Sequence, residues 1–160
     1  MKKGVPEVNR MTMAAVLVFS LFLPAAAQAQ GSADCEKLKK VFNTDVETVD
    51  GVCKVEIIRK NIKKATFMDK KLSMEMMELA FHFSFENVDG QTAVMGELAL
   101  LQDEVNPVLD ELTNGKLEIS ALHNHMLFEK PRIMYLHFQG MGDMDQQAAA
   151  IKAAIEKTSR

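Results

Sequence analysis

Three of the chain's four histidines lie within fifteen positions, at His123, His125 and His137. The residues around them are mostly apolar, since positions 121–138 read ALHNHMLFEKPRIMYLHF. Two histidines at i and i+2 on one strand, with a third on a neighbouring strand, can reach a single zinc or copper ion. The spacing therefore predicts a metal site, although histidines on an open sheet face are also typical of a solvated or partner-covered surface.

Alternation in the same stretch predicts the strands that position these histidines. Apolar and polar side chains alternate on both sides of the turn at 129–132, and successive residues of a strand point to opposite faces of a sheet. We expect Leu122, Met126 and Phe128 to face the core, which leaves the three histidines together on the open face. Asn124 interrupts this pattern, so it either satisfies a buried backbone group or marks a β-bulge.

An earlier hairpin supplies a carboxylate to the same face. ELAFHFSFE alternates, VDGQ turns the chain, and TAVMGELALL runs back. If the three phenylalanines lie inside, Glu97 projects from the open face, in the strand next to that of His137. Glu97 would then complete a set of four ligands with the three histidines.

The order of elements predicts the fold class. After residue 75 the chain reads strand, strand, helix, strand, strand, helix, with Asn106 as the expected N-cap of the first helix and Asp143 as that of the last. This ββαββα order predicts an α+β fold: an antiparallel sheet of about four or more strands, with helices packed on one face in a permuted ferredoxin-like arrangement. A short helix is expected in DCEKLKKVFN, ending before Asn43, with Ser32 or Asp34 as its cap. The segments GVCKVEIIRK and KKATFMDKK, separated by Asn61, are expected to form strands or irregular extensions with an exposed, lysine-rich edge.

The N-terminus predicts export. Lys2, Lys3 and Arg10 accompany the apolar run MTMAAVLVFSLFLPAAA, and AQA at 27–29 is typical of a signal-peptidase site. We therefore expect residues 1–29 to be a signal peptide and residues 30–160 to be a single domain. The mature protein is expected to be soluble in the periplasm or outside the cell, with no stable membrane anchor.

Export makes the two cysteines informative. Cys35 and Cys53 are 18 positions apart, and an even pair of cysteines in an oxidising compartment favours a disulfide. Two half-buried free thiols are the alternative.

Composition and charge bear on the partners. With 48% hydrophobic and 26% charged residues, the 160-residue chain is typical of one globular domain. A net charge of -3 without a long basic block in the second half excludes an electrostatic surface for nucleic acid. Met95, Leu127, Ile133 and Tyr135 would make the open face apolar, which predicts a homodimer that covers it.

The stretch VMGELALLQDEVNPVLDELTNGKLEISALHNHMLFEKPRIMYLHFQGMGD resembles the signature region of the LppY/LpqO family, which comprises exported bacterial proteins with a domain of unknown function. The resemblance covers roughly residues 33–157, and its densest motifs are DEVNPV, ALHNHM and the proline-arginine turn followed by HF. Many members resemble two such domains in tandem, whereas this chain has room for one. Carried onto this sequence, the motifs single out Glu97, Asp103, Glu104, Asn106, Pro107, His123, Asn124, His125 and His137.

These observations predict an exported binding domain. The expected metal ligands are His123, His125, His137 and Glu97, the ion being copper or zinc, and Asn124, Glu104 and Tyr135 are the other candidate ligand-binding residues. Nine methionines beyond the signal favour copper over zinc. One alternative is a metal-dependent hydrolase that uses Glu97 or Glu104 as general base; another is an interaction module without a ligand.

Overall fold

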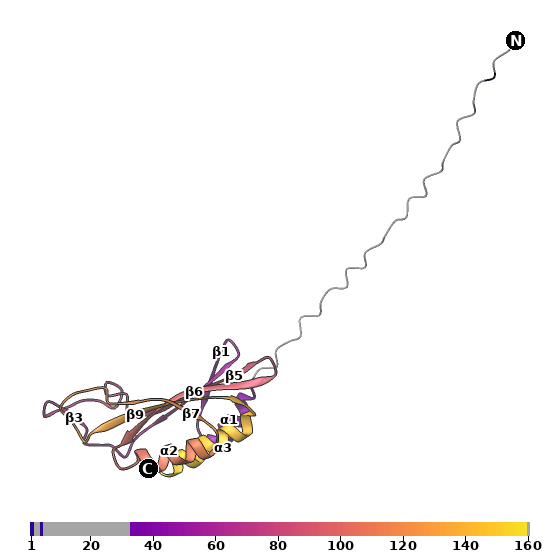
Figure 1. The fold of residues 1–160 in the computed structure, drawn as a ribbon. Helices are drawn as coiled ribbons and strands as arrows, with labels where there is room; N and C mark the ends of the chain where they lie inside the picture. Colours follow the sequence, from indigo (N-terminus) through magenta and orange to yellow (C-terminus); the bar gives the residue numbers. More distant parts are fainter. Residues whose placement is uncertain (2–3, 5–32, 160) are drawn as a thin grey trace.

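A computed structural model describes Met1, Gly4 and residues 33–159. Apart from Met1 and Gly4, the predicted signal peptide lies outside the described residues. The described chain is α+β, as predicted: a large antiparallel sheet is covered on one face by three helices (Figure 1). No helix in residues 33–159 is long and apolar enough to cross a membrane.

The large sheet has six strands in the order β1-β2-β5-β6-β9-β7, and all neighbours are antiparallel. Its strands are β1 (Val46–Val49), β2 (Val52–Ile58), β5 (Ala80–Val88), β6 (Gln91–Leu101), β7 (Glu118–His123) and β9 (Ile133–Gly142). The two predicted hairpins therefore pair through their central strands β6 and β9, and β1 and β2 extend the sheet beyond β5. A small sheet of β4 (Lys70–Lys71), β3 (Thr66–Phe67) and β8 (Glu129–Lys130) lies at one end of it (Figure 1).

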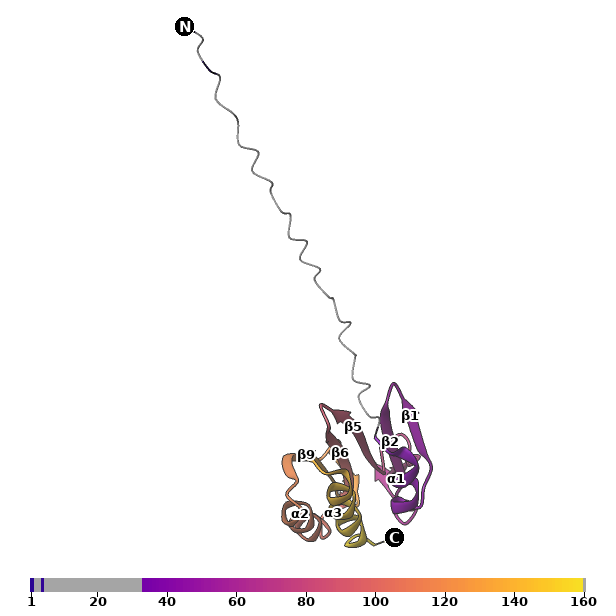
Figure 2. The ribbon, with the colours of Figure 1, turned by 90° about the vertical axis from the view of Figure 1, so that its right-hand side faces the viewer.

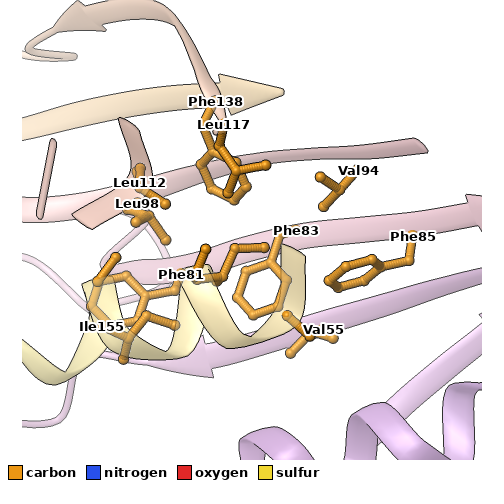
Figure 3. Close-up of a cluster of buried hydrophobic side chains, with 14 of the residues drawn as sticks. Val55, Phe81, Phe83, Phe85, Val94, Leu98, Leu112, Leu117, Phe138 and Ile155 are labelled. Carbon is orange, nitrogen blue, oxygen red and sulfur yellow. The ribbon is translucent and has the colours of Figure 1, made fainter. Parts of the chain in front are cut away.

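The helices α1 (Cys35–Phe42), α2 (Val105–Asn114) and α3 (Met144–Glu156) enclose the main core against the sheet. Helices α2 and α3 pack side by side, whereas α1 lies beside β1 and β2 (Figure 2). Alternate residues of β5, led by Phe83 and Phe85, point into this core toward Val55 and Ile155 (Figure 3). The predicted disulfide is confirmed: Cys35 and Cys53 are bonded, with Cα atoms 5.4 Å apart, and join α1 to β2.

The opposite face of the sheet is partly covered by the chain itself. Residues 59–79, which connect β2 to β5 and which we call the covering segment, pack over one end of this face. Together with residues of β6 and β9 they form a second core cluster of seven buried residues, namely Ile62, Ala65, Met77, Leu79, Ala99, Ile133 and Tyr135. The expected exposed edge is found only in part: the lysines of β4 are exposed, whereas Ile62, Ala65, Met77 and Leu79 of the covering segment are buried against the sheet. Two of the residues that suggested a homodimer, Ile133 and Tyr135, are therefore covered within one chain, and the homodimer stays a prediction.

Two local predictions need correction. The α2 helix starts at Val105, and its N-cap is Glu104 rather than Asn106, because the Glu104 carboxylate accepts a bond from the Leu101 N–H and so turns the chain directly from β6 into the helix. The predicted inward set of the second hairpin is also wrong: Leu122 and Phe128 are 43% and 69% exposed. Phe128 lies beyond the end of β7 at His123, so the strand alternation does not reach it, whereas Leu122 is exposed because it belongs to β7, the edge strand of the sheet.

Candidate metal centre

Three strands present Glu97, His123 and His137 on the face opposite the helices. Glu97 of β6 is paired with His137 of β9, and His123, the last residue of β7, is paired with Tyr135 of β9. Cross-strand partners project to the same face of an antiparallel sheet. The β-bulge between Ile119 and Ala121 sets the register that brings His123 to this face.

The four predicted metal ligands converge. One potential ligand atom from each of Glu97, His123, His125 and His137 lies within 4.8 Å of the other three; we call these residues the metal cluster. The His137 Nε2 atom is 2.8 Å from Glu97 Oε2 and 2.9 Å from His123 Nε2, and His125 Nε2 is 3.6 Å from Glu97 Oε2. A tetrahedral site with bonds of about 2.0–2.1 Å separates its ligand atoms by about 3.3 Å, so the cluster has the dimensions of a single-ion site.

His125 reaches the cluster from the loop after β7 rather than from a strand. Its ring stacks on the Tyr135 ring, with centroids 3.4 Å apart and an interplanar angle of 1°. Its Nδ1 atom is 2.8 Å from Glu78 Oε2, on the covering segment. The predicted i, i+2 pair on one strand is therefore wrong in its geometry, even though both histidines reach the same point.

Tyr135, a predicted ligand-binding residue, forms the floor under His125. It is only 2% exposed, and its hydroxyl donates to the backbone carbonyl of Met77. Burial, reinforced by the nearby Glu78 and Glu97 carboxylates, raises the pKa of the phenol, so it stays protonated. Tyr135 therefore contributes its ring to the site and uses its hydroxyl to hold the covering segment.

Asn124, also a predicted ligand-binding residue, shapes the loop between His123 and His125. Its Nδ2 group donates to the Met126 carbonyl at 2.7 Å. This bond turns the chain after β7 and satisfies a backbone acceptor, one of the two roles that the interrupted alternation suggested. Asn124 thus helps to place His125 over Tyr135.

Glu104 is engaged elsewhere and is not part of the metal cluster. Its carboxylate, which is buried, accepts five hydrogen bonds, two from the Arg59 guanidinium, one from the Leu101 N–H and two from Ser159. Burial alone would raise the pKa of Glu104, but these bonds outweigh it and hold the pKa below its ordinary value. Of the two acids considered as a general base, only Glu97 lies beside the histidines, and the hydrolase itself stays a prediction.

A family model matches the part of the chain that contains the metal cluster. The family model DUF1529, whose description is Domain of Unknown Function (DUF1259), matches residues 36–157. The chain belongs to this DUF1259 family. All four residues of the metal cluster lie within the matched span, whereas the predicted signal peptide lies outside it. The resemblance to the LppY/LpqO family stays a prediction.

No curated protein matches the chain, and no solved structure does. The permuted ferredoxin-like arrangement, as a named fold, accordingly stays a prediction.

Glu78 and His82 lie near the metal cluster but were not among the predicted ligands. Glu78, which bonds to His125, was not predicted, because it lies in a segment without periodicity and nothing in the sequence marks it. His82, the fourth histidine, is paired with Glu97 across the β5–β6 ladder but is not a member of the metal cluster. His82 is therefore a natural control for substitutions at the other three histidines.

Proposed function

We propose that this domain binds one divalent zinc or copper ion through His123, His125, His137 and Glu97. The observation that carries the proposal is the convergence of four ligand atoms, contributed by three strands and one loop, within 4.8 Å. His137 Nε2 lies within hydrogen-bond distance of both Glu97 Oε2 and His123 Nε2, and one ring nitrogen, with either a single proton or a single lone pair, cannot make both contacts as full hydrogen bonds. A bound cation would instead accept the lone pairs of both imidazole nitrogens and of the carboxylate.

The donor chemistry selects the class of ion. Three imidazoles with one carboxylate form a borderline set that suits Zn²⁺ and Cu²⁺, whereas Ca²⁺ and Mg²⁺ prefer oxygen ligands throughout. Copper was favoured on the number of methionines, but Met126, which is next to His125, packs against the second core cluster. The three histidines and Glu97 alone therefore support both ions, and affinity is expected to follow the general order in which Cu²⁺ exceeds Zn²⁺.

We further propose that the domain works outside the cytoplasm. The Cys35–Cys53 disulfide supports this, because structural disulfides form and persist in oxidising compartments. The basic and apolar N-terminus with its AQA site supports it independently.

Metal analysis of protein purified without an affinity tag tests the proposal. After export in a host cell, elemental analysis should detect close to one equivalent of zinc or copper, or the metal-free protein should take up one equivalent on titration. The variant His137→Ala should lose this binding, because the central ligand contacts both Glu97 and His123.

The matched control is His82→Ala, which removes a histidine from the same face and should bind metal like the wild type. In the metal-free state both variants should unfold at nearly the wild-type urea concentration, since partly exposed imidazoles contribute little to the core. Metal content that is unchanged in His137→Ala would contradict the proposal.

A further inference from the structure

His125 differs from the other members of the metal cluster in what holds it. Strands hold Glu97, His123 and His137, but β7 ends at His123 and β8 begins only at Glu129. A loop backbone gives less precise placement than a strand. Side-chain contacts must therefore orient the His125 imidazole if it is to act as a ligand.

Two contacts fix this imidazole. Stacking on Tyr135 sets the plane of the ring, and the 2.8 Å contact between Nδ1 and Glu78 Oε2 sets its rotation within that plane. A carboxylate can only accept a hydrogen bond, so Nδ1 carries the proton and the lone pair of the neutral ring lies on Nε2. The Nε2 atom is the one that faces Glu97, at 3.6 Å, so the lone pair points into the cluster.

The backbone of Glu78 is held firmly by its neighbours. Met77 and Leu79 are each 1% exposed, the Met77 carbonyl accepts the Tyr135 hydroxyl, and the Leu79 N–H donates to the Met74 carbonyl at 2.9 Å. The Glu78 side chain is nevertheless 60% exposed. An exposed ion pair contributes little to stability, so the stability of the fold does not account for a carboxylate placed at this nitrogen.

We propose that Glu78 is a positioning residue that holds His125 in the tautomer and orientation required for metal binding, and so links the covering segment to the site. The inference rests on the proposed function. Metal-bound histidines commonly donate their second ring N–H to a carboxylate, which orients the ring and raises its basicity. Here the carboxylate belongs to Glu78 of the covering segment, and none of the four candidate metal ligands lies in that segment.

The test compares zinc affinity among three variants by competition with a chromophoric chelator. Glu78→Ala should bind Zn²⁺ about 10–100-fold more weakly than the wild type, the usual cost of losing such a partner. Glu78→Gln retains an oxygen that accepts from Nδ1–H and should keep most of the affinity. Glu75→Ala removes an equal charge from an exposed position of the same segment and should bind like the wild type.

A second readout reports the tautomer in the metal-free protein. Side-chain ¹⁵N spectra should show His125 protonated at Nδ1 in the wild type, and Glu78→Ala should shift the ring toward a mixture of tautomers. An affinity and a tautomer in Glu78→Ala that match those of Glu75→Ala would overturn the inference, while the loss of zinc in His137→Ala would leave the proposed function standing. A wild-type protein that binds neither ion would overturn both.

Discussion

Replacing Glu104 by alanine should destabilise the fold strongly without affecting metal binding. Glu104 was a candidate ligand-binding residue, yet its carboxylate pairs with Arg59 at 2.8 Å, and the two side chains are only 5% and 2% exposed. In Glu104→Ala the guanidinium would keep its bonds to the carbonyls of Ala99 and Ser159 and its position over the Phe81 ring. It would lose both carboxylate oxygens, so a buried positive charge would be left uncompensated.

The size of the effect follows from this burial. Breaking a buried ion pair by removing one partner costs about 3–5 kcal/mol. The control is Glu111→Ala, on the same helix, whose partner Lys157 lies at 2.9 Å with 48% of its side chain exposed. An exposed pair of this kind is worth about 0–1 kcal/mol.

Urea unfolding measures the difference. With an m-value of about 2 kcal/mol/M, Glu104→Ala should lower the unfolding midpoint by about 1.5–2.5 M, and Glu111→Ala by less than about 0.5 M. The double variant Arg59→Met with Glu104→Met should recover part of the loss, because an apolar pair leaves no buried charge. Equal midpoints for Glu104→Ala and Glu111→Ala, or a loss of metal binding without destabilisation, would refute the reasoning.

Three further predictions concern the fold and its assembly. Removing the disulfide with Cys35→Ala and Cys53→Ala should lower the free energy of unfolding by about 3 kcal/mol, the chain-entropy value for a loop of this length, measured by urea unfolding; no loss would contradict this role. Because the pKa of Glu104 in the folded protein lies below its ordinary value of 4.5, its stabilisation is fully present above that pH and is lost as the pH falls through the folded value. The difference in urea unfolding midpoint between the wild type and Glu104→Gln should therefore become smaller as the pH is lowered below 4.5, and a difference that stays constant would contradict this prediction. Met95 and Leu127, each 66% exposed, are the residues that still favour a homodimer, which light scattering at tens of micromolar should detect; a monomer there would end that prediction.

The sequence predicted the elements that have regular periodicity. The alternation of Phe81, Phe83 and Phe85 identified the buried face of β5, and Asp143 was correctly predicted to cap α3, where it accepts from the Gln146 N–H. In both cases the signal is local, since it depends on residues within a few positions of one another.

The covering segment could not be predicted in this way. Its buried residues Ile62, Met77 and Leu79 are irregularly spaced, and they pack against Tyr135 and Ala99 from distant strands. One indirect signal was present, because an open face with Ala99 and Tyr135 is too apolar to be left in water. The sequence interpretation assigned that cover to a second copy, whereas the chain supplies much of it.

The sequence predicted which four residues form the candidate site, but not how each of them is positioned. His123, His137 and Glu97 follow from strand alternation and order. His125 lies beyond the end of β7, and its place depends on Tyr135 and Glu78, which are 10 and 47 positions away in the sequence. Contacts of this kind come from tertiary packing, for which a single sequence carries no periodic signal.

A crystal structure of the zinc-loaded protein, with anomalous data at the zinc edge, tests the central claim most directly. The account predicts one anomalous peak bonded to the Nε2 atoms of His123, His125 and His137 and to a Glu97 carboxylate oxygen, at about 2.0–2.2 Å. A peak bound elsewhere, or no peak at these four side chains in crystals grown with excess zinc, would contradict it.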